Sequence, residues 1–521
     1  MKNLLTLLVT LITAVAYSQN LTPVISITSV EVDEVSEEVL VNYSLQDDEN
    51  CSVWLKISED GGEYFETTPN TTGDVGEGII PSVDLSLTWT YTDLESSIAD
   101  VQIKIYASDG AAVSIQEMAD QVDESQLLDY METIVGERNY VSNPTNLQQV
   151  RNFLTSEFTD AGLQTESHEF LFAGTTMENI LGRKPGAREE DITYIIDGHF
   201  DGVEGSPGAD DNASAVAGVL ESLRILSQYE FEHSLRFIGF DTEEYGLIGS
   251  NRYNLNGIKP YEEIEGVLNF EMIGYYSDSP NSQSLPFGFD MLFPQAAQEI
   301  AEDDFRGNFI TVVGNVDSNV LIDAFESASE TYVPDLRVIS VAVPGTGTIA
   351  PDLRRSDHAS FWDNNIQALM LSDGANFRNL NYHTPDDVID SLNLSFMADV
   401  VKATLAAAAE LAVPISASFD LFDLSTILSV EDHDHDFPGE VTIFPNPTAG
   451  ILTLEISGVL NPFRTRLEVY SLDGKLVHRE VLNIASGTSR TRVDLGELSS
   501  ANYMLNLLSG EASVSLGVRV E

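Results

Sequence analysis

Histidines and carboxylates recur along the middle of the chain in patterns that suit metal binding and proton transfer. The first such segment is Gly198-His199-Phe200-Asp201, which directly follows the apolar run 192–197. A neutral imidazole that binds a metal needs a nearby acceptor to fix its tautomer, and Asp201 stands two residues after His199. A histidine with a purely structural role could occur in the same pattern, so this segment alone does not indicate a metal site.

Three further segments carry carboxylates at the ends of expected elements. Asp211 lies in Ala209-Asp210-Asp211-Asn212-Ala213, which opens an expected helix over 213–229 and would also suit an ordinary N-cap. Glu243 and Glu244 follow an expected strand over 234–241. Adjacent carboxylates at a strand end cannot both face one ion, so one can bind a metal while the other accepts a proton.

Glu271 ends the apolar run 267–270, where an unpaired buried carboxylate would be costly without a cation. Later in the chain, Asn381-Tyr382-His383-Thr384-Pro385-Asp386 supplies another imidazole, and Ser356-Asp357-His358-Ala359-Ser360-Phe361 precedes it. Each segment is ambiguous by itself. Their occurrence together and in this order points to a hydrolytic metal site.

The elements that must position these residues alternate between strands and helices over 117–414. Helices are expected over 126–135, 146–161, 213–229 and 395–411, and strands over 192–197, 234–241, 267–270 and 367–371. Such alternation predicts an α/β domain with a mainly parallel sheet and helices on both faces. Ligands in these folds gather at the carboxyl ends of the strands, where the segments above fall.

The residues before this region predict a different structure. Short alternating stretches rich in Val, Ile, Thr and Tyr, separated by Gly, Asp, Asn and Pro clusters, predict an antiparallel β-sandwich over 19–117. The pattern resembles immunoglobulin-like or fibronectin-like modules. Cys51 is the one cysteine, so no intramolecular disulfide can form, and we interpret it as a packed residue.

Residues 1–18 are typical of a secretory signal peptide, with Lys2, a short apolar stretch and the small-residue end Ala16-Tyr17-Ser18 before Gln19. The apolar stretch is shorter than the ~20 residues that a membrane span needs, and no other segment is long and apolar enough. We therefore expect a soluble exported chain without a transmembrane segment.

The charge excludes some partners. The 521 residues contain 25 Lys+Arg and 84 Asp+Glu, for a formal charge of −59. Nucleic acids and anionic membranes would be repelled by this excess, so neither is an expected partner. Acid is spread over the sandwich region, with 20 acidic and 2 basic residues, and the middle region, with 49 and 15, which fits a solvated, salt-tolerant surface.

The composition changes near the C-terminus. Residues 414–436 are expected to form a linker that includes the acidic run Glu431-Asp432-His433-Asp434-His435-Asp436, which we interpret as a spacer rather than a metal site. Residues 437–521 have 7 basic and 9 acidic residues and a second β-rich pattern. This shift predicts a separate domain.

In its motifs the middle region resembles metallopeptidase family twenty-eight, the co-catalytic zinc aminopeptidases of the bacterial leucyl aminopeptidase kind. The resemblance covers about Glu117 to Pro414 and implies a zinc peptidase domain over 118–413 that binds two zinc ions. It implies that Asp211 bridges the ions, that Glu244 and His383 complete one site, and that His199 and Glu271 complete the other. Glu243 would be the general base that takes a proton from the bridging water, and Asp201 would orient His199.

Two departures from the family pattern bear on activity. Family aminopeptidases usually have Asp at the position of Glu271, so preference for a free α-amine is less secure. A tyrosine that assists the oxyanion in a relative would fall at Leu353. Arg354 or Arg355 could replace it, bind a substrate carboxylate, or simply be exposed surface residues.

The C-terminal region resembles the sorting domain of the type IX secretion system of Bacteroidetes-type bacteria. The residues that carry the resemblance are Phe444-Pro445-Asn446-Pro447-Thr448-Ala449-Gly450, then Val469-Tyr470-Ser471-Leu472-Asp473-Gly474-Lys475 and Asn502-Tyr503-Met504-Leu505. It implies that the type IX machinery is a partner and that the tail is commonly removed on export. The alternative is a β-sandwich carbohydrate-binding module.

The sequence therefore predicts a secreted or surface zinc-dependent exopeptidase, exported through the periplasm and outer membrane, that acts as an aminopeptidase on peptides or proteins. A carboxypeptidase or a glutaminyl-cyclase-like enzyme of the same family remains an alternative. So does, from another class, a surface binding protein with an inactive peptidase domain. Retention of all five ligand positions together with Glu243 argues against that last reading.

Overall fold

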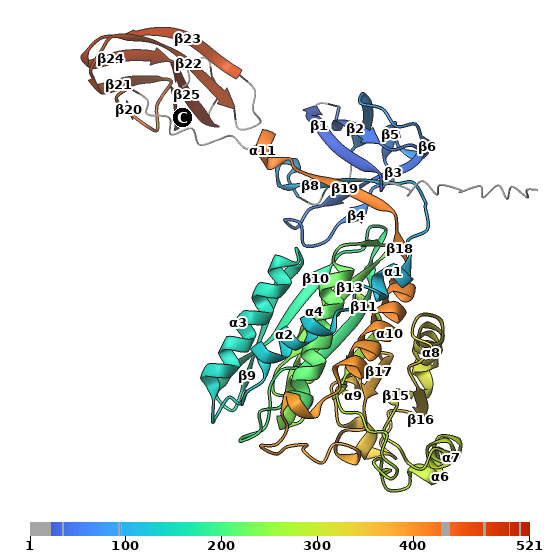
Figure 1. The fold of residues 1–521 in the computed structure, drawn as a ribbon. Coiled ribbons are helices and arrows are strands. Elements are labelled where there is room, and N and C mark those ends of the chain that lie inside the picture. Colours follow the sequence, from blue (N-terminus) through green and yellow to red (C-terminus); the bar gives the residue numbers. More distant parts are fainter. Residues whose placement is uncertain are drawn as a thin grey trace, which may run out of the picture. The chain divides into compact units, whose positions relative to one another are not determined.

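A computed structural model describes residues 22–33, 36–91, 94, 96–428, 438–471, 476–496, 498–499, 501–509 and 512–520. The predicted signal peptide at 1–18 and the acidic run at 431–436, with His433 and His435, lie outside the described residues. The chain divides into two compact units, Met1–Leu424 and Ser425–Glu521, and Figure 1 shows the elements of each.

The N-terminal region of the first unit forms two β-sheets. Strand β2 shows why, because Val39, Val41, Tyr43 and Leu45 alternate inward along it and are almost fully buried. One sheet has the order β1-β2-β7-β5, with β1 at Val24–Asp33, β2 at Glu38–Gln46, β7 at Leu85–Thr90 and β5 at Thr71–Gly73. The other has the order β19-β8-β3-β4, with β6 beside β3; β8 spans Gln102–Ser108, β3 Cys51–Ser58, β4 Glu66–Thr67 and β6 Gly76–Ile79.

Strand β19, at Ala417–Asp423, comes from the other side of the middle region in the sequence. It pairs antiparallel with β8, from Ala417 opposite Ser108 to Asp423 opposite Gln102. Strand β18, at Pro414–Ile415, pairs with β12, at Glu230–Phe231. We expected 414–436 to be a linker, but its first ten residues are mostly strand. These strands could not be predicted from the local sequence, because the partner strand of β19 lies about 300 residues away.

The middle region is built on an eight-stranded sheet of order β16-β15-β17-β14-β11-β13-β10-β9. Its strands are β9 at Gln164–Phe172, β10 at Thr175–Lys184, β11 at Glu189–His199, β13 at His233–Phe240, β14 at Glu263–Phe270, β15 at Ile310–Asn315, β16 at Val338–Val343 and β17 at Ala368–Ser372. The centre, β13-β11-β14-β17, is parallel. The pairs β9–β10, β10–β13 and β15–β17 are antiparallel, so the sheet is mixed where we expected a mainly parallel one.

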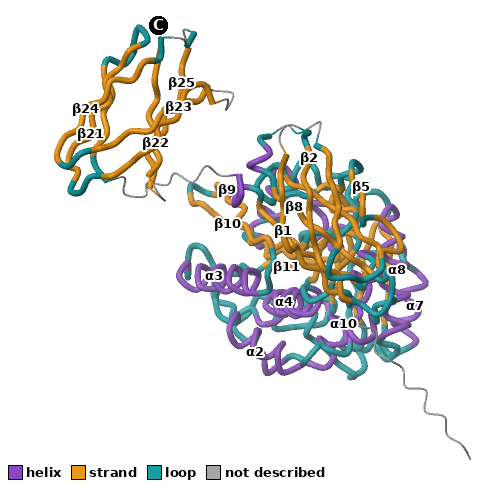
Figure 2. Tube along the Cα trace, turned by 90° about the horizontal axis from the view of Figure 1, so that it is seen from above, coloured by secondary structure: helices purple, strands orange, loops and turns teal. Residues whose placement is uncertain are grey.

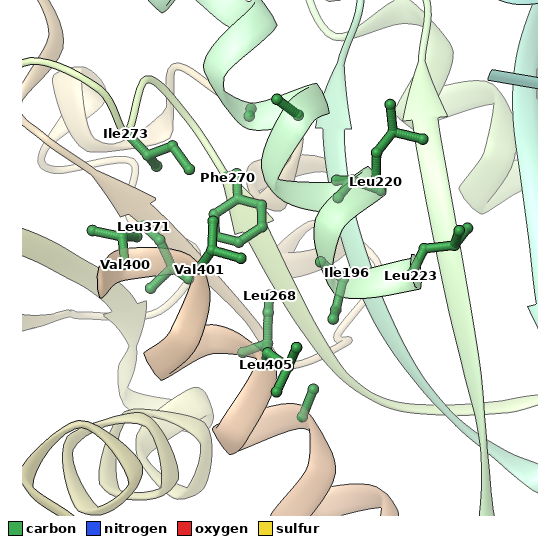
Figure 3. Close-up of a cluster of buried hydrophobic side chains, with 14 of the residues drawn as sticks. Ile196, Leu220, Leu223, Leu268, Phe270, Ile273, Leu371, Val400, Val401 and Leu405 are labelled. Carbon is green, nitrogen blue, oxygen red and sulfur yellow. The ribbon is translucent and has the colours of Figure 1, made fainter. Parts of the chain in front are cut away.

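Both faces of the central strands are buried, which explains their continuous apolar runs. Ile196, Leu268 and Leu371 point into one core and their neighbours Ile195, Val267 and Met370 into another. Figure 3 shows part of the first core, where Ile196, Leu268 and Phe270 face side chains of α4 and α10.

Helices cover each face. The first core is closed by α2 at Glu124–Ile134, α3 at Pro144–Asp160, α4 at Ala215–Leu226, α8 at Asn319–Tyr332 and α10 at Leu394–Ala412; α1, at Ile115–Ala119, packs beside α10. The second is closed by α5 at Ile248–Asn256, α7 at Pro294–Glu302 and α9 at His358–Trp362, with α6 at Phe289–Leu292 beside α7. Figure 2 shows α2, α4 and α10 together on one side of the strands.

Buried polar contacts join the N-terminal sheets to the middle region. Lys56 of β3 is fully buried and pairs with Glu190 of β11 at 2.8 Å. The Trp54 indole N–H donates to the carbonyl oxygen of Ala187 at 2.8 Å. Removal of either partner of the Lys56–Glu190 pair would leave the other as an uncompensated buried charge, so a substitution at one of them is expected to destabilise this interface.

The second unit begins with the short helix α11, at Ser425–Leu428, and forms two further sheets. They have the orders β20-β21-β24 and β23-β22-β25-β26. The strands are β20 at Glu440–Phe444, β21 at Ile451–Val459, β22 at Phe463–Ser471, β23 at Leu476–Ile484, β24 at Gly487–Asp494, β25 at Ala501–Ser509 and β26 at Ala512–Val520. Leu454, Leu467, Val493 and Leu505 belong to its core. Within the described parts of both units, no helix combines the length and apolarity required to cross a membrane.

Candidate metal centre

The predicted ligands meet at the carboxyl ends of the parallel strands. His199 is the last residue of β11, Glu243 and Glu244 follow β13, and Glu271 follows β14. His383 arrives from the loop before α10. Because parallel strands all end at one edge of the sheet, residues far apart in the sequence converge there.

Two groups of three side chains form, each with one ligand atom per residue within 4.8 Å of the others: His199, Glu243 and Glu271, and Asp211, Glu244 and His383. In the first group, His199 Nε2 lies 3.4 Å from Glu271 Oε2 and 3.8 Å from Glu243 Oε2. In the second, His383 Nε2 lies 2.9 Å from Asp211 Oδ2 and 3.1 Å from Glu244 Oε2. Asp211 joins the groups, because its Oδ1 is 3.5 Å from His199 Nε2.

Asp211 is placed by a loop that the chain fixes from several sides. Gly208 adopts φ 62°, and a Cβ there would lie 2.4 Å from the Asp211 carbonyl oxygen, so the turn requires glycine. The buried Asp387 accepts hydrogen bonds from the backbone N–H groups of Asp210 and Asp211, at 2.9 and 3.1 Å. Asn212 links the loop to the end of β14, since its Oδ1 accepts from Met272 N at 2.9 Å and its Nδ2 donates to Phe270 O at 3.2 Å.

Asp201 fixes the turn that carries the two glutamates. Its carboxylate accepts from the backbone N–H of Glu243 at 2.9 Å and of Glu244 at 3.3 Å. Its Oδ1 is 3.5 Å from His199 Nδ1, which is too long for a strong hydrogen bond. Asp201 therefore positions the Glu243–Glu244 turn at least as firmly as it orients the imidazole.

The electrostatics suit cations. Burial raises the pKa of Glu243 well above its usual range, His199 opposes this shift, and Glu271 and Glu244 add to it. Burial together with the Asp211 charge raises the pKa of Glu244 to about 7. Burial alone would lower the pKa of His383, but its contacts with Asp211 and Glu244 raise it to about 10.

These residues pass a test of fit to metal ions. Within the described parts of the chain, Glu244 Oε1 has no hydrogen-bond partner, and His383 Nε2 faces two carboxylate oxygens although a neutral imidazole has at most one proton to give. Imidazole nitrogens and carboxylate oxygens are the donor set of zinc sites. Divalent ions would offset the repulsion among the carboxylates and bring their pKa values down.

Three further residues that the sequence analysis considered have other surroundings. His358 is fully buried with its Nε2 3.0 Å from Leu353 O, and burial lowers its pKa to about 3, so it is a neutral packed residue. Leu353 lines an apolar pocket. Arg354 pairs with Asp363 at 2.7 Å.

Sequence reasoning missed two residues beside the ligands. Tyr382 stacks on the His383 ring with centroids 3.7 Å apart, and its hydroxyl accepts from Arg355 Nη2 at 2.9 Å. Its place directly before His383 was the available signal. Asp387 was passed over for its neighbour Asp386, and nothing in the sequence distinguishes the buried carboxylate from the exposed one.

A pocket opens beside Glu271. Tyr382, Arg355, Asn376 and Asp352 supply most of its other polar lining. Its apolar lining consists of Leu285, Pro286, Phe289, Ile300, Phe309, Val313, Leu353, Met370, Ala375 and Phe377. The site thus combines a set of metal ligands, a candidate base and an apolar recess.

The strand ends of the α/β sheet carry clustered metal ligands and a candidate base, Glu243. Together with the family match and the relatives, this site indicates a hydrolytic peptidase. The chain belongs to peptidase family M28, whose model matches residues 179–408. The Secretion system C-terminal sorting domain matches residues 442–519, which implies export by the type IX machinery to the cell surface or the medium.

Three relatives illustrate the match. Uncharacterized protein YfbL of Escherichia coli is 30% identical over 276 residues, which cover 50% of this chain and 80% of that protein. Aminopeptidase YwaD of Bacillus subtilis is 38% identical over 20% of this chain and 23% of its own length. The probable leucine aminopeptidase 2 of Aspergillus oryzae is 27% identical over 46% of each. The chain thus spans less than half the length of these two aminopeptidases.

Proposed function

We propose that the chain is a zinc-dependent aminopeptidase that removes apolar residues from the N-termini of peptides. The observation that carries this proposal is the direct opening of the apolar pocket beside Glu271, one of the clustered ligands. A recess lined mainly by aliphatic and aromatic side chains suits an aliphatic or aromatic side chain of the substrate. An apolar side chain in it would bring the adjoining peptide bond close to the ligand cluster.

In this proposal, His199, Asp211, Glu244, Glu271 and His383 hold two zinc ions, which the two groups of three ligand residues support. Bound zinc would activate the attacking water and polarise the scissile carbonyl. Glu243 accepts the proton of the attacking water and passes it to the leaving amine, which needs an unprotonated carboxylate within reach of both. The Tyr382 hydroxyl donates a hydrogen bond to the carbonyl oxygen as negative charge develops on it.

The charges around the pocket favour a free α-amine over a free carboxylate. Glu271 and Asp352 are the acids that line it, and Glu243 lies in the same ligand group as Glu271. Among the described residues that line the pocket, Arg355 is the one cation, and it already donates to Tyr382 and Asn376. A carboxypeptidase would need a cation that is free to bind the substrate, so this arrangement supports an aminopeptidase.

The test compares anilides of leucine with a free and an acetylated α-amine, a dipeptide blocked at its N-terminus, and an N-terminal glutaminyl peptide. We expect p-nitroaniline release from the free leucine anilide alone, lost with a chelator and restored by zinc. Cleavage of the blocked dipeptide would indicate a carboxypeptidase. Cyclisation of the glutaminyl peptide, with zinc near one per chain, would indicate the cyclase-like alternative.

A further inference from the structure

Two adjacent arginines beside the ligand cluster have different partners. The Arg354 guanidinium pairs with Asp363 at 2.7 Å and donates to the carbonyl oxygen of Thr346. Arg355 instead donates from Nη2 to the Tyr382 hydroxyl at 2.9 Å and from Nη1 to Asn376 Oδ1 at 2.8 Å. Arg355, Asn376 and Tyr382 all line the apolar pocket, so these contacts join two chain segments at its polar end.

The contact with Arg355 determines whether the Tyr382 hydroxyl donates or accepts in this hydrogen bond. A guanidinium has only donors, so the phenol oxygen must accept in this hydrogen bond. The hydroxyl proton is then left for another acceptor. The stacking of the Tyr382 ring on His383 restricts the ring itself, and therefore the direction in which that proton can point.

Besides Tyr382, the polar neighbours of Arg355 are Asn376 and Asp352. Asn376 contributes its carbonyl oxygen to Arg355, which leaves the guanidinium bound on two sides. The nearest acid on the same segment as Arg355 is Asp352, at 4.0 Å. Arg355 is thus held mainly by Asn376 and Tyr382 rather than by a carboxylate.

We propose that Arg355 is a positioning residue that directs the Tyr382 hydroxyl proton toward the carbonyl oxygen of the substrate. The inference rests on the proposed function, because it assigns Arg355 a part in the same hydrolysis. Without Arg355 the phenol can rotate and donate to water or to a ligand carboxylate. The hydroxyl would then no longer be preorganised for the developing oxyanion, which is where such donors act.

The experiment uses the full-length, zinc-loaded protein and the variants Arg355→Met, Tyr382→Phe, their combination and Arg355→Lys, with Arg354→Met as the matched control. For leucine p-nitroanilide we expect Tyr382→Phe to lower kcat about 100-fold and Arg355→Met about 10-fold, each with KM within about 2-fold. In the Tyr382→Phe background, Arg355→Met should change kcat less than about 2-fold, because the group that it positions is gone. Arg355→Lys should recover part of the loss, and Arg354→Met should match the parent protein.

Several results would overturn the assignment. A raised KM with unchanged kcat in Arg355→Met would mean that Arg355 binds substrate directly. An equal loss in the parent and Tyr382→Phe backgrounds would mean that it acts independently of the tyrosine. Zinc content and the thermal midpoint are measured for each variant, and a loss of either in Arg355→Met would assign the arginine a structural role instead. A parent protein inactive on every anilide would refute the proposed function itself, whereas an active parent with additive variants would refute only the positioning role.

Discussion

Glu243 and Glu244 are adjacent in the chain but belong to different groups of ligand residues. The short turn after β13 explains this, because both backbone N–H groups are held by Asp201 while the two side chains diverge. Two carboxylates of the same chemistry can therefore take different roles, one toward a metal and one toward a proton.

Substitution of Glu243 tests this division of roles. Glu243→Gln keeps the size and polarity of the side chain but removes its ability to accept a proton, so we expect kcat to fall by about 10²- to 10⁴-fold. The zinc content should be unchanged, as measured by atomic absorption on dialysed protein. Glu204→Gln, on the exposed loop after Asp201, is the matched control and should keep full activity. Full activity in Glu243→Gln would remove Glu243 as the base.

Zinc affinity should rise with pH. The contacts of His383 with Asp211 and Glu244 raise its pKa to about 10, so the metal-free imidazole carries a proton at pH 7 that zinc must displace. Affinity should therefore increase about tenfold per pH unit for each proton released between pH 6 and 9. Calorimetry of the metal-free protein in buffers of different ionisation enthalpy counts those protons. A pH-independent affinity would mean that His383 does not lose a proton when zinc binds.

Among the elements, the turns that carry the ligands share a backbone feature. Thr242, Met272 and His383 have φ of 56°, 54° and 59°. Each such conformation costs a non-glycine residue about 1–2 kcal/mol. The buried contacts of Asn212 and Asp201 next to these turns supply compensating interactions.

Strand β19 offers a test at this scale. A chain that ends after residue 428 keeps β19, whereas one that ends after residue 416 exposes the edge of β8 and the side chains that β19 covers. We expect the longer chain to retain activity and the thermal midpoint of the first unit. The shorter chain should lose at least several degrees in midpoint, measured by calorimetry, and tend to aggregate. Equal midpoints for the two chains would show that β19 adds no stability.

Some elements could be predicted from the sequence and others could not, for physical reasons. Strands β11, β13 and β14 are buried on both faces, so their apolar runs could be recognised in the sequence. His199 is the last residue of β11, and Glu243 and Glu271 follow β13 and β14. Strand β9 is an edge strand whose first six residues are polar, and β19 leaves Phe419 and Leu421 41% and 47% exposed. The polar start of β9 lacks the alternation that predicts a half-buried strand, and the alternation in β19 covers only the five residues Ala417 to Leu421.

The candidate site was more predictable than the fold around it. Ligand types at the ends of expected elements indicated the segments that carry the six clustered residues, and the resemblance to family twenty-eight selected the residues within them, such as Asp211 rather than Asp210. Tyr382 and Asp387 were not identified, because their roles depend on contacts with Arg355 and with the Asp210–Asp211 backbone that no local pattern encodes.

At the scale of the molecule, the acidic excess is more extreme on the surface than in the sequence. Lys56 and Lys104 are the basic residues of 19–117, and both are buried. Lys104 lies over the Phe65 ring at 3.9 Å, and burial lowers its pKa to about 8. The described surface of the N-terminal sheets therefore has acids that no lysine on the same region offsets.

Salt should stabilise the first unit for this reason. The Debye length falls from about 10 Å at 0.1 M to about 3 Å at 1 M, so repulsion among the surface acids is screened. We expect the thermal midpoint to rise by roughly 2–8 °C between 0.01 and 1 M sodium chloride, in the range of 1–2 kcal/mol. The isolated segment 437–521, with 7 basic and 9 acidic residues, should respond much less and serves as the control. A midpoint that falls or stays constant for the first unit would contradict the screening argument.

The pairing of β19 with β8 also implies a delay between the synthesis of the two strands. A chain made from its N-terminus completes β8 at Ser108, but β19 begins only at Ala417. At about 5–20 residues per second, synthesis of the intervening segment takes roughly 15–60 s. For that period the β8 edge has no intramolecular cover, and it is then open to pairing with another chain. The N-terminal domain is therefore the first to be synthesised and among the last to close.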